Sequence, residues 1–487
     1  MEGCFIGIDQ GSSASKAVVV GSEGQVLFQA RTELPPPFRE GSRIEHDPSD
    51  VLRSVRNVLD DAVRAARDAG VPVLGIGLSC QRSSCLAWSG ATGEPLTPVL
   101  SWRDTRGSDL VGGIHDQGPR IRRLSGLPLT PYYSASKLRW IRDHAAIGRT
   151  SDTVFGTLSS FLVRRLTGSG RNEIDATHAA RTQLMNICTL AWDQDLLGIF
   201  GLAGIRLPEI VPSAHRHGSV RTPIGDTPLL AAIGDQQAAM LGLGMLAEGD
   251  AVINYGTGGF LLANTGRTLL PAEKLMASVL YSAETGSRFL LEGSVNAAGD
   301  ALEWLRLHLG LFKEYREVDE LCRKATTDTV AFIGLNGTGA PHWEENISSS
   351  FHGLTGKSTS ADLVRAVVEG IAFFIMDIAE EVRKSGIGLK RTVLAGGLSS
   401  FTYLRQVQAD ILGADMLVSQ GPEASAMGAA YLAGMQQGAW TDDDILRMVK
   451  NGETVQGRPN PGLERRYRIW RELHRITREL DGERNPQ

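Results

Sequence analysis

The chain has 487 residues, of which 42% are hydrophobic and 22% charged, as in globular rather than disordered proteins. The formal net charge of −5 leaves no basic excess, so binding to nucleic acid or to an anionic membrane surface is not expected. Five scattered cysteines without a CxxC pair argue against a disulfide framework or a structural zinc site, and favour buried free thiols in a reducing cytoplasm.

No uninterrupted apolar stretch reaches about 18 residues, and the first residues lack the basic run of a signal peptide. We therefore expect a cytoplasmic protein without a membrane partner. Glycine is over-represented, with 56 residues. The later glycines follow apolar runs, which indicates backbone loops that approach a ligand.

The first half opens with a predicted hairpin. Residues 5–8 and 17–20 are apolar strands on either side of a polar bend at 9–13. A helix then begins at Pro48, where Asp47 can cap it, and ends at Gly70. Strands at 73–78 and 85–88 follow, and this alternation of strands and long helices predicts an α/β fold.

The second half repeats this pattern. A strand at 229–233 leads to Asp235, where a helix is expected to begin, and residues 251–262 form a second hairpin around a glycine-rich bend. A strand at 392–395 runs into Gly396 and Gly397, before a helix at 403–411. Two similar halves predict two domains facing across a cleft. The predicted parts are residues 1–245, 246–450 and a terminal helical segment, 451–487.

The terminal segment has the period of an amphipathic helix over residues 462–480. Its six arginines could contact RNA or lipid, but the preferred interpretation is a docked helix with a solvated basic face. The expected docking face consists of Leu463, Tyr467, Trp470, Leu473, Ile476 and Leu480.

The two bends are candidate phosphate-binding loops, although the Walker A and GxGxxG signatures are absent. Small residues let consecutive backbone N–H groups face phosphate oxygens. Hydroxyls, a Lys16 ammonium and an Asp9 carboxylate suited to Mg²⁺ accompany them. Taken alone, the first bend also fits an ordinary turn. The second bend and the glycine pair at 396–397 favour phosphate binding.

Several short motifs stand in a fixed order along nearly the whole chain. They are Ile8-Asp9-Gln10-Gly11-Ser12-Ser13, Gln81-Arg82, Ser101-Trp102-Arg103-Asp104, Pro131-Tyr132-Tyr133-Ser134, Gly234-Asp235-Gln236-Gln237, Tyr255-Gly256-Thr257-Gly258, Gly337-Thr338-Gly339-Ala340-Pro341-His342-Trp343 and Ala395-Gly396-Gly397. Together they resemble the FGGY family of carbohydrate kinases, in the actin-like ATPase superfamily, and its glycerol kinase branch most.

The resemblance implies both a fold and an activity. The fold would be α/β, with two actin-like (ribonuclease H-like) ATPase domains flanking a catalytic cleft. The activity would be ATP- and Mg²⁺-dependent phosphorylation of a hydroxyl group on a small polyol or sugar. Relatives commonly form homo-oligomers, and a dimer is the expected assembly.

The resemblance also assigns roles to individual residues. Asp235 would be the catalytic base, and Asp9 and Asp235 would hold the metal. Substrate contacts would come from Arg82, Ser83, Trp102, Tyr132, Asp235, Gln236 and Phe260. ATP contacts would come from Gly11, Ser12, Ser13, Lys16, Gly256, Thr257, Gly299, Glu303, Gly396, Gly397 and Phe401.

Other interpretations of these residues stay open at this point. Asp235 could simply cap a helix, and Trp102 and Tyr132 could pack in the core. The pair His215 and His217 has no carboxylate nearby in sequence, so the sequence does not favour a metal site there.

Two departures from glycerol kinases leave the substrate open. Ser83 stands where they carry a glutamate that takes substrate hydroxyls, so a wider pocket and a longer polyol or a ketose are plausible. Phe401 stands where they carry an asparagine, and its ring could stack on adenine or pack. One alternative is a ketose kinase of the xylulokinase or ribulokinase type. The other, an actin-like ATPase binding protein without an acceptor, is disfavoured by Arg82 and Trp102.

Overall fold

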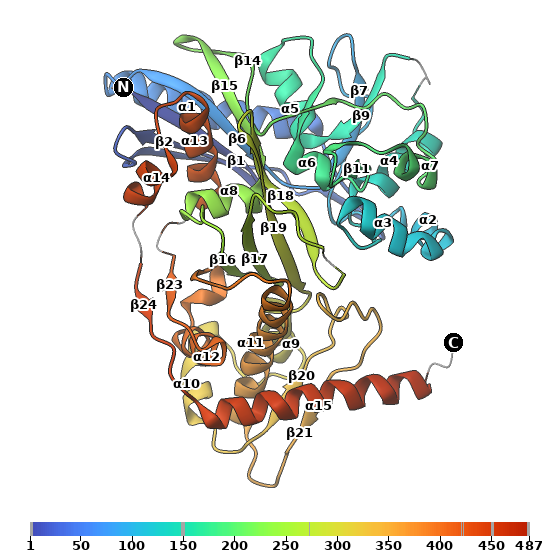
Figure 1. The fold of residues 1–487 in the computed structure, drawn as a ribbon, viewed down its shortest axis with the longest axis vertical. Coiled ribbons are helices and arrows are strands. Elements are labelled where there is room, and N and C mark those ends of the chain that lie inside the picture. Colours follow the sequence, from blue (N-terminus) through green and yellow to red (C-terminus); the bar gives the residue numbers. More distant parts are fainter. Residues whose placement is uncertain are drawn as a thin grey trace.

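The computed structural model describes residues 3–147, 151–271, 273–419, 421, 423–449 and 452–484. Two large sheets dominate the fold, one in each half of the chain (Figure 1). The first contains, in spatial order, β14 (Ala214–Thr222), β15 (Gly225–Gly234), β6 (Val73–Cys80), β1 (Cys4–Gln10), β2 (Ala14–Gly21) and β3 (Val26–Glu33). The second contains β18 (Met276–Ala283), β19 (Gly286–Val295), β17 (Gly259–Gly266), β16 (Asp250–Tyr255), β22 (Arg391–Ala395), β23 (Met416–Val418) and β24 (Thr454–Val455).

The two sheets share one pairing pattern. β1 pairs antiparallel with β2 and parallel with β6, and β16 likewise pairs antiparallel with β17 and parallel with β22. In each half, the hairpin predicted from sequence therefore supplies one central strand and its neighbour. This confirms the predicted α/β fold with two similar halves.

Smaller sheets and the helices complete the structure. A five-stranded sheet contains β4 (Phe38–Glu40), β5 (Arg43–His46), β8 (Val99–Leu100), β7 (Cys85–Ser89) and β9 (Thr153–Thr157). Three strand pairs are β10 (Glu173–Asp175) with β13 (Glu209–Val211), β11 (Met185–Asn186) with β12 (Ala191–Trp192), and β20 (Val330–Phe332) with β21 (Ser350–His352). The α-helices are α1 (Pro48–Asp68), α2 (Ser108–Gly113), α3 (Gly118–Ser125), α4 (Ser134–His144), α5 (Leu158–Thr167), α6 (Ala176–Ala180), α7 (Gln194–Ile199), α8 (Asp235–Gly242), α9 (Gly299–Leu307), α10 (Val318–Lys324), α11 (Ser360–Lys384), α12 (Thr402–Leu412), α13 (Ala424–Gln436), α14 (Asp442–Met448) and α15 (Pro461–Arg484).

The structure confirms the predicted start and end of helix α1. The Asp47 side chain accepts a hydrogen bond of 2.7 Å from the backbone N–H of Ser49, and Pro48 occupies the first turn. Gly70 follows the helix with a φ of +70°, a conformation that glycine adopts without strain. The buried face of α1 packs on β2 and β3.

Helix α13 comes from the second half of the chain but packs on the first sheet, against β1 and β6 (Figure 1). Glycines allow this approach: a Cβ on Gly7 would lie 1.8 Å from Ala426 O, and one on Gly77 would lie 1.9 Å from Ala429 O. The division at residues 245 and 450 stays a prediction about domains, and this helix links the two parts physically.

Helix α15 runs along the second half, across the bottom of Figure 1, and contacts β20, α11 and α12. Leu463, Tyr467 and Trp470 are buried as predicted, and Leu473 is partly buried. The prediction is wrong for Ile476 and Leu480, which are exposed.

The buried stripe of α15 passes instead through two polar residues. His474 Nε2 donates a 2.7 Å hydrogen bond to the Glu344 carboxylate, and Thr477 shares one of 2.7 Å with Ser350. The spacing 463, 467, 470, 474, 477 keeps a continuous helical face. In the last turns of α15, the buried face is therefore held by hydrogen bonds and not by the predicted apolar contacts.

Four of the five cysteines are buried, as the sequence predicts, and the fifth is not. Cys4, Cys80, Cys85 and Cys322 are buried, and Cys188 is exposed, contrary to the expectation for buried thiols. None of these five described cysteines forms a disulfide. Within the described part of the chain, no helix is both long and apolar enough to cross a membrane.

Candidate active site

The bend of the first hairpin leaves its small residues open to solvent. Gly11 N donates to Ala14 O at 3.0 Å, which closes the turn, and Ser12 and Ser13 are exposed. The bend of the second hairpin is similar: Gly256 N donates to Gly258 O at 2.8 Å, and Thr257 is exposed. Both bends can therefore present hydroxyl and backbone groups to an anion.

The second bend is held by the start of α9. The backbone N–H groups of Ala298 and Gly299 donate to Thr257 O and Gly256 O, each at 3.0 Å. A Cβ on Gly299 would lie 2.7 Å from Gly256 O, so this contact requires glycine. The structure thus brings together Gly256, Thr257 and Gly299, which the sequence analysis predicted as ATP contacts.

Gly396 joins the same corner from the end of β22. Its φ is +88°, and a Cβ there would lie 2.3 Å from Tyr255 O, at the end of β16. Only glycine fits this left-handed, close approach. Gly397 begins the short helical turn Gly397–Ser400, and nothing lies within 4 Å of its hypothetical Cβ. Gly396 therefore packs closely against the end of β16, while the space beside Gly397 is open.

Asp9 and Asp235 lie at one edge of the first sheet. Asp9 is opposite Ser79 in the parallel pair β1–β6, and Ile233 is opposite Ser79 in the parallel pair β15–β6. Carboxyl ends of parallel strands meet at the same edge, where ligands bind in open α/β sheets. Asp235 follows β15 directly, so the two predicted carboxylates flank β6.

The surroundings of Asp9 disfavour its charged form. Burial, then the nearby Asp235 carboxylate, raises the pKa of Asp9 to about 7, although a 3.0 Å hydrogen bond from Ser79 Oγ opposes this. Lys16 lies opposite Asp9 on β2 and pairs with Glu423 of the second half at 3.0 Å. A divalent cation would offset the repulsion between the two carboxylates, and oxygen donors suit Mg²⁺.

Asp235 occupies the first position of α8, but its side chain does not close the helix as an N-cap, because Gly234 holds that position. Its Oδ1 lies 3.3 Å from Arg82 Nε, and its side chain keeps 37% exposure. Ser425 of α13 donates a 3.0 Å hydrogen bond to Asp235 O. The carboxylate is thus presented to solvent from a position that both halves of the chain hold.

Arg82 belongs to a buried ionic network that the sequence analysis missed. Glu292, fully buried on β19, lies 3.1 Å from Arg82 Nη1 and 3.0 Å from Arg181 Nη1. Burial alone would raise the pKa of Glu292, but the two guanidinium groups hold it below its ordinary value. The only sequence signal was a glutamate within an apolar strand. This network fixes Arg82 beside Asp235.

Ser83 adopts a strained backbone conformation next to Arg82. Its φ is 65°, and its Oγ donates to Arg181 O at 3.3 Å. The following Ser84 Oγ accepts a 2.9 Å hydrogen bond from Trp102 N, which places the partly buried Trp102 near Arg82. Ser83 is buried, so its hydroxyl is already engaged with the protein.

Tyr132 and Tyr133 are adjacent in sequence, but one side chain is exposed and the other is buried. Tyr132 is 50% exposed, so core packing does not account for it. Tyr133 is buried under the Arg181 guanidinium, 5.1 Å from its ring centre, and donates to Met276 Sδ at 3.1 Å. The core aromatic of this motif is therefore Tyr133, which leaves Tyr132 available to a ligand.

The side-chain amide oxygen of Gln236 accepts no hydrogen bond from the described residues. This atom, Oε1, is buried. An unpaired buried amide oxygen costs free energy unless a ligand satisfies it. Phe260 is partly buried and packs at the margin of an apolar cluster.

On the nucleotide side, Phe401 is 8% exposed and stacks on Tyr315, with ring centres 6.2 Å apart. Tyr315 in turn donates a 2.9 Å hydrogen bond to Glu303, which also pairs with Arg306. These contacts support the packing interpretation of Phe401. A contact with adenine stays a prediction.

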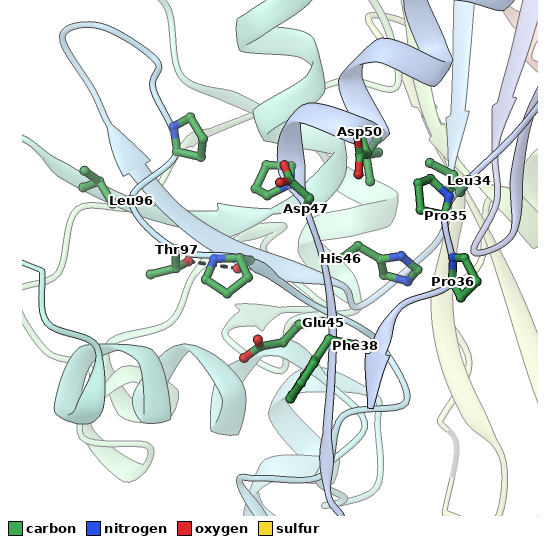
Figure 2. A pocket seen from close by; sticks show the side chains of 14 residues that line it. Leu34, Pro35, Pro36, Phe38, Glu45, His46, Asp47, Asp50, Leu96 and Thr97 are labelled. Atoms are coloured by element: carbon green, nitrogen blue, oxygen red, sulfur yellow. Dashed lines mark hydrogen bonds between the residues drawn. The ribbon is translucent and has the colours of Figure 1, made fainter. Parts of the chain in front are cut away.

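A separate pocket of about 530 Å³ opens beside the first turn of α1 (Figure 2). Pro35, Phe38, His46 and Asp47 are among its lining residues. None of the predicted site residues lines it. The candidate active site is therefore the edge that carries Asp9 and Asp235, not this pocket.

Comparison with known proteins places the chain in a family. Residues 4–242 match the N-terminal domain, and residues 251–437 the C-terminal domain, of the FGGY family of carbohydrate kinases. The chain belongs to the FGGY family. The resemblance seen in the motifs is thereby confirmed, and the protein is a carbohydrate kinase, a phosphotransferase acting on a sugar or polyol.

Curated FGGY relatives and solved structures agree with this assignment. The chain is 35% identical over 483 residues to a glycerol kinase of Acidiphilium cryptum, covering 95% of this chain and 96% of that protein. It is 37% identical over 459 residues to a glycerol kinase of Rhizorhabdus wittichii, covering 91% and 90%. A crystal structure of Plasmodium falciparum glycerol kinase with ADP superposes with a TM-score of 0.91, 27% identity and 98% coverage of both chains. A xylulose kinase from Rhodospirillum rubrum shares the fold, with a TM-score of 0.88 and 21% identity, covering 98% of this chain and 99% of that one.

Proposed function

We propose that this FGGY kinase transfers the γ-phosphoryl group of ATP, with Mg²⁺, to a hydroxyl group of a small polyol, with glycerol as the first candidate. The observation that carries the proposal is the position of Asp9 and Asp235 at the ends of β1 and β15, on either side of β6 and at the edge where the first bend is exposed. The family and the glycerol kinase relatives support the same reaction class.

Asp235 serves as the general base. The acceptor hydroxyl oxygen forms a bond to the γ-phosphorus, the bond from that phosphorus to the β–γ bridging oxygen breaks, and the hydroxyl proton passes to the Asp235 carboxylate. Arg82, 3.3 Å from Asp235 Oδ1, orients that carboxylate. Because phosphoryl transfer has a loose transition state, positioning and charge neutralisation supply most of the acceleration.

The nucleotide lies between the two bends in this proposal. Gly11, Ser12, Ser13 and Lys16 contact its phosphates from the first half, as do Gly256, Thr257, Gly299, Gly396 and Gly397 from the second, while Glu303 and Phe401 border the nucleoside. Asp9 and Asp235 would hold Mg²⁺, whose chemistry is to neutralise charge on the phosphate oxygens.

The acceptor occupies the space in front of Arg82, Gln236 and Tyr132. The unpaired Gln236 Oε1 accepts a substrate hydroxyl, and the rings of Trp102 and Phe260 cover its C–H faces. Ser83 supplies no carboxylate, and its hydroxyl is engaged with Arg181 O, so the pocket is wider than one with glutamate there. A ketose kinase of the xylulokinase or ribulokinase type is therefore the second candidate.

An acceptor panel tests the proposal. ADP release by the full chain with Mg²⁺ and ATP is measured alone and with glycerol, erythritol, xylulose and ribulose. Stimulation by glycerol or erythritol supports the polyol kinase, and preferential stimulation by a ketose supports the second candidate. Stimulation by none of these acceptors would contradict both candidate substrate classes.

Assembly and location are further proposals. We infer a cytoplasmic homodimer, on the strength of the resemblance to relatives that oligomerise. Light scattering on the purified chain gives the mass directly, and a monomer mass at micromolar concentration would contradict the dimer.

A further inference from the structure

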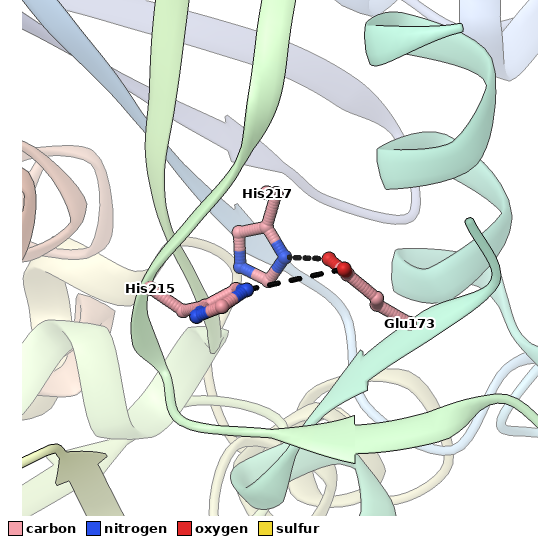
Figure 3. A group of neighbouring side chains, drawn as sticks. All are labelled: Glu173, His215 and His217. Atoms are coloured by element: carbon pink, nitrogen blue, oxygen red, sulfur yellow. Dashed lines mark hydrogen bonds and ion pairs between the residues drawn. The ribbon is translucent and has the colours of Figure 1, made fainter. Parts of the chain in front are cut away.

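Two histidines and a glutamate outside the candidate active site lie close together (Figure 3). His215 and His217 are on β14, and Glu173 is on β10, 42 residues earlier than His215. One ligand atom of each lies within 4.8 Å of the others. The fold thus supplies the carboxylate that the sequence around His215 and His217 lacks.

The backbone of β14 is irregular where these histidines stand. Its pairing with β15 shifts register between Ala214 and Gly218, so residues 215–217 lie in a bulge. Bulges redirect side chains and are frequent beside functional sites. β10 pairs with β13, and β14 follows β13 along the chain. Glu173, the first residue of β10, contacts His217 in the bulge. In Figure 3 the three side chains point toward one another.

The distances within the cluster suit a common metal ion. His217 Nδ1 lies 2.9 Å from Glu173 Oε2, and His215 Nε2 lies 3.9 Å from Glu173 Oε1. Metal–ligand bonds of about 2.0–2.2 Å in a tetrahedral site place neighbouring ligand atoms about 3.3–3.5 Å apart. The two observed separations bracket that value, so small side-chain movements suffice.

The histidines also include buried ring nitrogens that have no hydrogen-bond partner among the described residues. His217 is fully buried, and its Nδ1 faces Glu173, whereas the unpaired nitrogen of the same ring is Nε2. The His215 Nε2 is likewise buried and unpaired in a hydrogen bond, while 28% of its side chain is exposed. An ion can therefore reach the cluster past His215. The buried His215 Nε2 faces Glu173 without a hydrogen-bond partner among the described residues, and a bound ion would satisfy this nitrogen.

We propose that Glu173, His215 and His217 bind a divalent first-row transition cation of the Zn²⁺ type. Two imidazoles and one carboxylate form a donor set that Zn²⁺ accepts, with a fourth position left for water. Nitrogen donors disfavour Mg²⁺, so this site is chemically distinct from the proposed catalytic one. The ion fastens the bulge of β14 to β10, which continues into α6 and Arg181.

Arg171 competes with a cation in this site. Its Nη1 lies 2.8 Å from Glu173 Oε1, and its Nη2 donates to His217 O at 2.6 Å. Because 49% of the Arg171 side chain is exposed, it can move into solvent when a cation binds Glu173. Without a metal, the same contacts form an ordinary ion-pair cluster. If a metal binds here, removing the Arg171 charge should strengthen metal binding, whereas a cluster with a purely structural role would not bind metal in either case.

Titration calorimetry with Zn²⁺ alone as the probe, in excess Mg²⁺, tests the site on the full chain. We expect one Zn²⁺ per chain, and at least about tenfold weaker binding in His215→Asn and His217→Gln. His144→Asn, which alters an exposed histidine elsewhere, is the matched control and should bind as the unaltered chain does. Arg171→Gln should bind several-fold more tightly.

Thermal unfolding provides an independent readout. Zn²⁺ should raise the Tm of the unaltered chain and of His144→Asn, but not that of His215→Asn. Circular dichroism checks that the variants are folded, and the partly exposed His215 keeps the test valid if His217→Gln unfolds. No stoichiometric Zn²⁺ binding, equal affinity in His215→Asn, or no gain in Arg171→Gln would overturn the proposal.

Discussion

Arg82 Nε lies 3.3 Å from Asp235 Oδ1, while the same guanidinium is held through Nη1 and Nη2 by the buried Glu292 of the second half. The Arg82 side chain thus connects the proposed base to Glu292 on β19, which lies 210 residues after Arg82 in the sequence. The position of the base consequently depends on contacts between the halves as well as on its own helix.

Arg82→Met should destabilise the protein by about 3 kcal/mol, because it leaves the fully buried Glu292 with Arg181 as its remaining charged partner. Chemical denaturation followed by fluorescence measures the change. Arg31→Met is the matched control: its pair with Glu33 is exposed, so the cost should stay below about 1 kcal/mol. Equal effects in the two variants would contradict the role of the buried network.

Gly428→Ala should destabilise the contact between α13 and α8 by about 2 kcal/mol or more, since the new Cβ would lie 1.8 Å from Ala238 O. A lower Tm in differential scanning calorimetry is the expected result. Gly388→Ala, where nothing lies within 4 Å of the added Cβ, should leave the Tm nearly unchanged. A neutral Gly428→Ala would show that the helices can separate freely.

Asp9→Asn should stabilise the metal-free protein above pH 7. A carboxyl whose pKa rises from 3.8 to about 7 on folding keeps its proton longer in the folded state, so stability falls as pH rises between those values. An increase of about three in pKa corresponds to about 4 kcal/mol. Because part of Asp9 faces solvent, we expect Asp9→Asn to recover about half of this at pH 8. Melting curves in a chelator should therefore differ more at pH 8 than at pH 4.5.

Adding Mg²⁺ and ATP should reverse that order, because the unaltered Asp9 then gains a binding partner that asparagine lacks. An Asp9→Asn protein that binds Mg²⁺ and ATP as tightly as the unaltered chain would contradict the metal role of Asp9.

Local sequence signals predicted the elements that depend on neighbouring residues. The Asp47 cap, Pro48 and the apolar face gave α1, and the glycine-rich bends gave both hairpins. The motifs also led to the carboxylates at the sheet edge. The signals for α1 and for each hairpin lie within about twenty residues, which is the range that periodicity and turn chemistry cover. The roles of the two carboxylates came from the family resemblance instead.

Contacts between distant segments could not be predicted in this way. Nothing near Glu292 in sequence points to Arg82 or Arg181, and nothing in α13 points to the glycines of β1. Tyr133 and Tyr132 are adjacent, so composition alone could not tell the buried ring from the exposed one. In the last turns of α15, His474 is buried instead of the predicted Ile476, because Glu344 provides a hydrogen-bond partner for the imidazole.

Acceptor-dependent phosphorylation by Asp235→Asn tests the central claim most directly. Asparagine keeps the size of the side chain but cannot take the hydroxyl proton, so turnover with the preferred acceptor should fall about 10²–10⁴-fold. ATP affinity, measured by calorimetry without Mg²⁺, should change little, because Asp235 is not among the proposed ATP contacts. Turnover equal to that of the unaltered chain would contradict the assignment of Asp235 as the base.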